Sequence, residues 1–294
     1  MEPMRSAPYK ENGSVLLVDS MASAHHQEVR NALTVARAGM QLVPIASLSG
    51  YERPNENRVA QIFKSLEQTK ILINPVIVDA NLNLLIDGHH RIEAFKWVGL
   101  KQIPAFNVSY LSNDVRVESW ARVTRAPVDK IVSLFDALVV DVTRGRWSVV
   151  ATSGGFIIRR RFFDEVMDAA NYLERFKLCL SAYEYAVEIE PEPMPLAGNW
   201  SGKVHIYTDP VVGKDEVLGA VRANKRFPYQ VNRHLINNRP IGMRFPLDVL
   251  GSVERFEKFV DKVFARGLPS LITGGTVLDG RSYAENVITF SKAD

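Results

Sequence analysis

Residues 75–91 of the 294-residue chain read Pro-Val-Ile-Val-Asp-Ala-Asn-Leu-Asn-Leu-Leu-Ile-Asp-Gly-His-His-Arg, and they carry the clearest structural signal in the sequence. The β-branched run at 75–78 predicts a strand, residues 79–83 predict a turn, and 84–86 predict the returning strand. A helix is expected next, because Ile92, Phe95 and Val98 recur at helical spacing and Gly99 is a typical helix stop. The stretch therefore predicts a hairpin that passes directly into a helix.

The residues on either side extend this pattern. Short apolar runs predict strands at 42–45 and 103–108. Between them, apolar residues recur at i, i+3, i+4 and i+7 over 59–66, which predicts a helix capped by Asn55 or Asn57. Alternating strands and helices of this kind favour an α/β (α+β) fold.

Further along, the patterns predict a second α/β lobe. The expected division is an N-terminal extension over 1–40, a core over 41–124 and a C-terminal lobe over 125–294. Within the extension, 14–18 is expected to be a short strand and 26–39 a helix. Pro191-Glu192-Pro193-Met194-Pro195 is typical of a surface connector, and 253–264 predicts an amphipathic helix.

Composition excludes several classes of protein. The chain is 46% hydrophobic with a formal charge of +3, which gives no sign of a nucleic-acid partner. Cys179 is the sole cysteine, so an internal disulfide and a cysteine-rich metal site are excluded. The first residues lack the apolar stretch of a signal peptide, and no apolar run is long enough to cross a bilayer. We therefore expect a cytoplasmic protein without a membrane partner.

The segment Asp87 to Arg91 carries the chemistry. A strand that turns on glycine into a helix points several backbone N–H groups into one space, where they and the helix dipole attract anions. Gly88 allows close backbone approach. Arg91 adds a fork of donors suited to phosphate, and His89 and His90 can add more. Phosphate or carboxylate binding is expected here.

Asp87 sharpens this interpretation. A carboxylate beside an anion site repels phosphate unless a cation lies between them, and Mg²⁺ binds through one or two carboxylates plus phosphate oxygens. A magnesium nucleotide satisfies both features. The alternative is that Asp87 only caps the helix and that the His pair is merely solvated. Zinc is less favoured, because adjacent His89 and His90 rarely reach one metal.

The same residues resemble a known group of proteins. The strands, the Asp-Gly-His-His-Arg motif, Ala94, Gly99 and Ile103-Pro104 resemble the ParB/sulfiredoxin superfamily, and this version of the motif resembles the free L-serine kinases. The resemblance implies a ParB/sulfiredoxin-like N-terminal domain, and a phosphoryl transfer from ATP or ADP with Mg²⁺ to free L-serine. The O-phospho-L-serine formed would feed cysteine-type or diaminopropionate- and siderophore-type biosynthesis.

The resemblance also implies roles for individual residues. Glu52 would be the base for the serine hydroxyl, and Asp87 would be catalytic and hold the metal. The segment from Gly88 through His89, His90 and Arg91 would bind nucleotide phosphates. Residues proposed near the substrate are Trp120, Arg233 and His234. The chain departs from the pattern at Gln230, where a lysine is expected, and at Asn232, where a hydroxyl residue is expected.

Three alternatives remain open at this point. A ParB-like, nucleotide-dependent DNA-binding or regulatory protein is the first, although no basic recognition helix stands out. A regulatory or scaffold protein that keeps only the ligand pocket is the second. The third is a kinase acting on another hydroxy amino acid. An oligomer is also compatible with the N-terminal extension.

Overall fold

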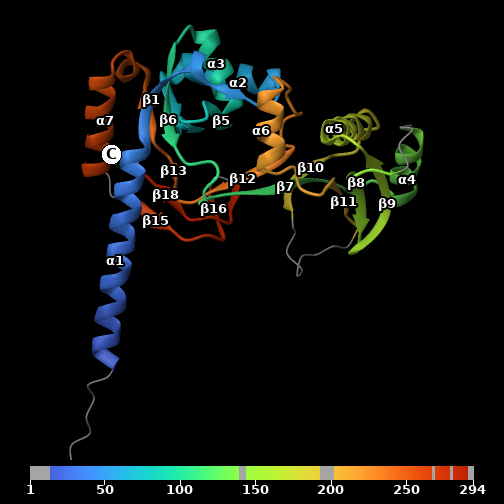
Figure 1. Cartoon of the computed structure of the whole chain (residues 1–294), viewed down its shortest axis with the longest axis horizontal. Coiled ribbons are helices and arrows are strands. Elements are labelled where there is room, and N and C mark those ends of the chain that lie inside the picture. Colours follow the sequence, from blue (N-terminus) through green and yellow to red (C-terminus); the bar gives the residue numbers. More distant parts are fainter. Residues whose placement is uncertain (1–13, 139–143, 193–201, 267–268, 279–280, 291–294) are drawn as a thin grey trace, which may run out of the picture.

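The computed structural model describes residues 14–138, 144–192, 202–266, 269–278 and 281–290. Two groups of elements lie side by side and are joined by the long strand β7 and its neighbours (Figure 1). Most buried apolar side chains form one continuous cluster that includes residues of both groups. The two lobes are therefore joined by packing as well as by the chain.

The first lobe is built on a five-stranded sheet in the order β1-β6-β4-β5-β2. Its strands are β1 (Met40–Pro44), β2 (Ser49–Gly50), β4 (Val76–Asp79), β5 (Leu84–Asp87) and β6 (Gln102–Asn107). β4 and β5 are antiparallel, as the hairpin pattern predicted. Asp79 Oδ1 accepts the N–H groups of Asn81 and Leu82, which explains the tight turn between them.

Two helices of this lobe lie next to each other and place the motif. α2 (Glu56–Thr69) is capped by Asn55, whose side chain accepts the Arg58 N–H at 3.1 Å. α3 (His89–Val98) begins directly after β5 and ends at Gly99, whose φ of 83° is left-handed. Ile92 and Phe95 are buried beneath α3. The predicted strand-turn-helix is confirmed.

The second lobe is built on a six-stranded sheet. Its path is β10-β7-β11-β8-β9, and β12 also pairs with β7. The strands are β7 (Val115–Thr124), β8 (Trp147–Ser153), β9 (Phe156–Phe163), β10 (Glu188–Glu192), β11 (Val204–Asp209) and β12 (Asn232–Ile236). The helices of this part are α4 (Val128–Ala137), α5 (Val166–Ala182) and α6 (Lys214–Arg222).

The last part of the chain returns to the first lobe. β14 (Arg244–Pro246) pairs with β3 (Ile71–Ile73), and α7 (Val253–Arg266) contacts β1 and α1 (Ser14–Gly39). The remaining elements are β13 (Arg239–Ile241), β15 (Ser270–Ile272), β16 (Thr276–Leu278), β17 (Arg281–Tyr283), β18 (Val287–Thr289) and the 3₁₀ helices η1 (Ile45–Ser47) and η2 (Leu247–Gly251). This return brings side chains from residues 239–283 to the Asp-Gly-His-His-Arg motif.

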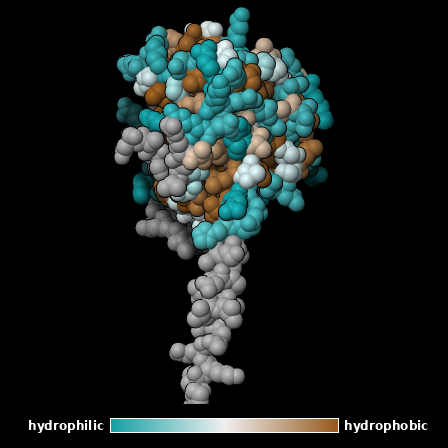
Figure 2. All heavy atoms as spheres, turned by 90° about the vertical axis from the view of Figure 1, so that its left-hand side faces the viewer, coloured by the Kyte–Doolittle hydropathy of each residue, from teal (hydrophilic) through white to brown (hydrophobic). Residues whose placement is uncertain are grey.

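Helix α7 is amphipathic, as its pattern predicted. Phe256 and Val260 are buried, whereas Glu254, Lys258 and Asp261 are exposed. Figure 2 shows this face of the molecule as mainly hydrophilic, with smaller apolar areas between. No helix in the described ranges is both long and apolar enough to span a membrane.

Two local predictions were wrong. The expected strand at 14–18 belongs to α1, because a short apolar run does not by itself distinguish strand from helix and no glycine or proline interrupts the pattern before Gly39. The expected connector at 191–195 begins inside β10, where Pro191 lies opposite Trp120. β10 is an edge strand, where proline is tolerated. Residues 193–195 lie outside the described residues.

Candidate active site

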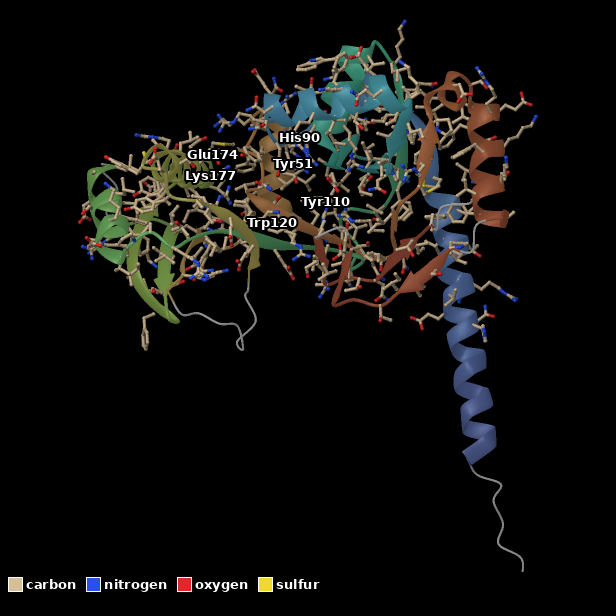
Figure 3. The ribbon with its side chains drawn as sticks, turned by 180° about the vertical axis from the view of Figure 1, so that it is seen from behind. Tyr51, His90, Tyr110, Trp120, Glu174 and Lys177 are labelled. Atoms are coloured by element: carbon tan, nitrogen blue, oxygen red, sulfur yellow. The ribbon has the colours of Figure 1, made fainter. Side chains whose placement is uncertain are left out.

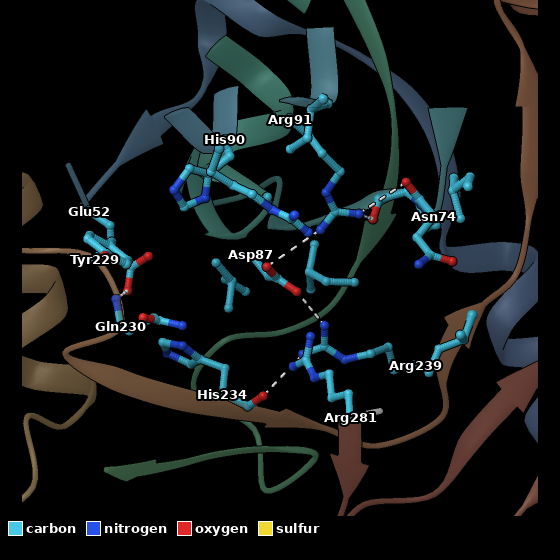
Figure 4. A pocket seen from close by; sticks show the side chains of 18 of the residues that line it. Glu52, Asn74, Asp87, His90, Arg91, Tyr229, Gln230, His234, Arg239 and Arg281 are labelled. Carbon is cyan, nitrogen blue, oxygen red and sulfur yellow. Dashed lines mark hydrogen bonds and ion pairs between the residues drawn. The ribbon is translucent and has the colours of Figure 1, made fainter. Parts of the chain in front are cut away.

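A cavity of about 910 Å³ lies where the motif meets the returning chain. Its walls come from the first lobe, from Trp120 of β7, from residues 229–241 and from the β17 strand (Figure 4). Glu52, Asp87, Gly88, His90 and Arg91 all contribute to it, with Arg233 and His234. His89 is not among its lining residues.

The β5–α3 turn has no room for any residue but glycine. Gly88 has φ 111°, and a Cβ added to it would lie 2.5 Å from Val76 Cγ1. No side chain caps the start of α3. The first N–H groups of a helix, here from His89 to Arg91, have no intrahelical acceptor, so they can receive an anion at the cavity wall.

Asp87 lies in a strongly positive environment. Its Oδ2 accepts a hydrogen bond from the Arg239 Nη1, and its Oδ1 lies 3.5 Å from the Arg91 Nη2. Arg281 adds a third positive charge. Burial opposes ionisation of this carboxyl, but the three positive charges outweigh it and hold its pKa well below the usual range. Asp87 is an ionised carboxylate throughout the physiological range.

Glu52 lies in the opposite electrostatic environment. Burial raises its pKa to about 8, and the charge of Asp87 adds to the rise. The Gln230 N–H donates to Glu52 Oε1 at 3.2 Å. Backbone hydrogen bonds between Tyr51, Arg53 and Phe227 fix the loop that carries it. A held carboxyl with a pKa near neutrality is suited to general base catalysis.

The two motif histidines have different surroundings. His89 Nε2 accepts the Tyr51 N–H at 3.2 Å, so its proton is on Nδ1, which lies 3.6 Å from Glu52 Oε2. Burial lowers the pKa of His89 to about 3, so the ring is neutral. His90 instead lines the cavity, and its buried Nε2 has no hydrogen-bond partner in the described part of the chain. His90 is thus able to donate to a ligand, whereas His89 supports the Glu52 loop.

His234 is occupied on both sides of its ring. The Tyr51 hydroxyl lies 3.1 Å from Nδ1 and the Tyr110 hydroxyl 2.9 Å from Nε2. Burial lowers its pKa to about 3. The hydroxyl of Tyr51 also approaches Ile86 O, at 3.3 Å. In this structure His234 positions Tyr51, the residue before Glu52.

Arg233 and Trp120 form one unit at the cavity wall. The guanidinium lies 5.2 Å from the Trp120 ring centroid and donates to Ser282 O at 2.6 Å. Glu118 and Glu285 lie 3.9 and 4.0 Å from the same guanidinium. Both side chains line the cavity, so the substrate contacts proposed for them stay predictions.

A chain of polar contacts links Glu52 to the second lobe. Gln230 donates its N–H to Glu52, and its carbonyl accepts from Arg122 Nη1 at 2.9 Å. Arg122 is fully buried and lies 3.8 Å from Glu174 of α5. Lys177, also on α5, donates to the Tyr229 hydroxyl. Figure 3 shows Glu174 and Lys177 on the second-lobe side of Tyr51, His90 and Trp120.

Sequence reasoning missed several residues of this site. The sequence analysis assigned no role to Arg239, Arg122 or Arg281. No local signal marks them, because each becomes relevant only through a partner more than 50 positions away.

The comparisons support the fold. A structure of SbnI from Staphylococcus aureus with a C-terminal truncation matches with a TM-score of 0.61 at 16% identity, over 78% of this chain and 98% of the other. A free serine kinase in complex with AMP matches with a TM-score of 0.58 at 16% identity, over 72% and 93%. The chain is thus a two-lobed α/β protein with the fold of the free serine kinases.

The sequence comparisons agree with that class. An ATP-dependent L-serine kinase of Desulfurococcus mucosus is 21% identical over 71% of this chain and 90% of its own length. A ParB-like protein of Sulfolobus acidocaldarius is 38% identical over 76 residues, which span 24% of this chain and 37% of that protein. No protein-family model matches. The resemblance to the free serine kinases is confirmed.

Proposed function

We propose that this protein is a small-molecule kinase that transfers a phosphoryl group from a magnesium nucleotide to the hydroxyl of free L-serine, giving O-phospho-L-serine. The observation that carries the proposal is one cavity that holds both Glu52, with its pKa of about 8, and an ionised Asp87 beside an anion-binding helix start. The similar kinase of Desulfurococcus mucosus is ATP-dependent, which favours ATP over ADP as donor.

The residues present fit a magnesium ion bound together with phosphate. Asp87 Oδ1 lies 3.5 Å from the Arg91 Nη2, and the Asp87 side chain is 30% exposed, which leaves this oxygen accessible to an ion. No group of three or more acidic, histidine or cysteine side chains among the described residues forms a protein-only cage. Magnesium typically needs one or two carboxylates when phosphates supply further oxygens. The ion would neutralise charge on the phosphates.

The chain's own residues then have distinct tasks. The backbone N–H groups at the start of α3, with His90, hold phosphate oxygens. Glu52 accepts the proton of the serine hydroxyl while that oxygen bonds to the transferred phosphorus. The bond between the transferred phosphorus and the oxygen that bridges it to the rest of the nucleotide breaks. The nucleoside diphosphate leaves with the electron pair of that bond. Gln230 and His89 keep the Glu52 carboxylate directed at the cavity.

The substrate end of the cavity is assigned to Trp120 and Arg233. A ring and a guanidinium stacked at the wall offer an apolar platform and a donor for the serine carboxylate. His234 positions Tyr51, the residue before Glu52. Cysteine-type and siderophore-type pathways stay predictions for the fate of the product.

Phosphorus NMR of one mixture series tests the proposal. Purified protein, Mg²⁺ and either ATP or ADP are incubated with L-serine and, separately, with other hydroxy amino acids. A new phosphomonoester signal with L-serine is expected, and Glu52→Gln should lower its rate by about 10²- to 10⁴-fold. Glu67→Gln, an exposed acid on α2, is the matched control. Phosphorylation of another hydroxy amino acid but not of serine would redirect the proposal.

A nucleotide-dependent DNA-binding protein is the second candidate, because the short ParB-like match reaches 38% identity. It predicts DNA affinity that falls steeply with salt concentration. Titration of labelled duplex DNA at low salt, with and without nucleotide, separates the two functions.

A further inference from the structure

Arg281 lines the cavity although it is far from the Asp-Gly-His-His-Arg motif in the sequence. It lies on β17, which pairs with β16 so that Arg281 lies opposite Leu278. Its guanidinium stacks over the Tyr283 ring, 5.1 Å from the centroid. Figure 4 places Arg281 beside Arg239, on the opposite side of Asp87 from Arg91.

Two of the other cavity arginines are already engaged with acceptors of the protein. Arg91 donates to the carbonyls of Asn74 and Pro75, at 3.1 and 2.6 Å. Arg239 holds Asp87 and donates to His234 O at 3.1 Å. These guanidiniums therefore serve mainly to build the wall.

Arg233 is engaged in the same way. It donates to Ser282 O and lies near the carboxylates of Glu118 and Glu285. Its positive charge is balanced by the protein before any ligand arrives.

Arg281 differs from these three. Within the described part of the chain its guanidinium has no hydrogen bond and no ion pair. Its buried Nε is unpartnered, as are those of Arg233 and Arg239, but the Nη atoms of those two arginines have acceptors. A guanidinium with unsatisfied donors in a partly closed cavity costs free energy unless an anion completes it. Its charge is close enough to lower the pKa of Asp87, Arg91 and Arg233. Asp87 thus lies within reach of the charge of Arg281, but no acidic side chain among the described residues forms an ion pair with it.

We propose that Arg281 binds phosphate oxygens of the nucleotide, so that the phosphate tail is held between the start of α3 and the β16–β17 hairpin. This inference rests on the proposed function only in taking a nucleotide as the ligand. A guanidinium presents several donors in a fork that matches phosphate, and such charge-assisted bonds are the strong ones. Tyr283 keeps the fork in place.

Calorimetric titration with ATP, ADP and adenosine, each with Mg²⁺, tests the assignment. Arg281→Gln should weaken ATP and ADP binding by about 10- to 100-fold and leave adenosine affinity unchanged, because only the phosphates lose their donor. Arg281→Lys should recover part of the loss, since it restores the charge without the fork. Arg244→Gln, an exposed arginine on β14, is the matched control and should bind as the wild type does.

The outcomes separate this inference from the kinase activity. Unchanged ATP and ADP affinities in Arg281→Gln overturn it, and so does an equal loss for adenosine, which would mean that the hairpin itself is disturbed. Thermal melting of each variant identifies a folding defect. A wild type that binds nucleotide through Arg281 but leaves serine unphosphorylated would sink the proposed function and leave this inference standing.

Discussion

The carboxyl groups of Asp87 and Glu52 share one cavity but differ in their ionisation. Asp87 faces guanidiniums, and its pKa lies well below the usual range. Glu52 is buried with a backbone N–H as its polar partner and with the charge of Asp87 nearby, and its pKa rises to about 8. The carboxyl at one end of the cavity is therefore always ionised, whereas the carboxyl at the other end exchanges a proton near neutral pH.

This difference in pKa suits the two carboxyl groups to different roles in the proposed reaction. A carboxylate that never protonates suits a metal ion and phosphate, and a carboxyl that titrates near neutrality suits proton transfer. The charge of Asp87 is one cause of the raised Glu52 pKa, so the two ends are coupled. Variants of either residue test the comparison.

Asp87→Asn should have the largest effect. We expect kcat/KM to fall by about 10⁴-fold, which corresponds to the several kcal/mol that a metal ion contributes to phosphoryl transfer. Without Mg²⁺ the variant should bind ATP at least as well as the wild type, because a negative charge facing the phosphates is gone. Titrations with Mg²⁺ and with a chelator measure both effects, and Asp129→Asn on α4 is the control.

An equal Mg²⁺-dependent gain in ATP affinity in Asp87→Asn and in the wild type would contradict the metal role. The aspartate would then only balance Arg239 and Arg91.

The pH dependence of wild-type activity should report the ionisation of Glu52 directly. Glu52 must lose its proton to act as a base, so kcat/KM should rise with pH through an apparent pKa of about 8. Bound Mg²⁺ would stabilise the ionised form of Glu52. The rise of kcat should therefore occur at a lower pH than the rise of kcat/KM. Steady-state rates over a pH series, corrected for nucleotide ionisation, provide the measurement. If the residual activity of Glu52→Gln rises with pH in the same way, the group that titrates is not Glu52.

A smaller effect is expected on stability. In the unfolded chain Glu52 ionises with its ordinary pKa of 4.5, whereas the folded chain keeps the proton up to about 8. The contribution of Glu52 is thus fully present below 4.5 and is lost as pH rises through 8. Glu52→Gln cannot ionise, so it should be more stable than the wild type above pH 8, by about 1–3 kcal/mol.

Urea unfolding of both proteins below the ordinary glutamate pKa and above the raised one checks this difference. A stability gain that is the same at both pH values would mean that the substitution acts through packing.

The same comparison shows how far sequence reasoning reached. The hairpin, the turn at Gly88, helix α3 and its stop at Gly99 follow from residues close together in the chain, and the structure confirms them. The choice between Asn55 and Asn57 as the cap of α2 was settled by the structure in favour of Asn55. Local patterns predict local structure, because caps, turns and periodic apolar faces are short-range features.

The environment of each carboxylate could not be predicted from the sequence. Arg239 lies 152 positions from the Asp87 that it contacts, and Gln230 lies 178 positions from Glu52. The tertiary structure places the His234 ring between two tyrosine hydroxyls, and the substrate contact expected for it stays a prediction. The edge position of β10, which tolerates Pro191, is likewise a property of the sheet as a whole.

Local sequence is enough to identify the Asp-Gly-His-His-Arg turn, the helix start that can receive an anion, and the two acidic residues at positions 52 and 87. The tertiary structure alone decided that these residues share a cavity, which arginines surround Asp87, and that Glu52 is held by the Gln230 backbone. The physical reason is that backbone conformation depends on neighbouring residues, whereas burial and charge depend on segments that only folding brings together.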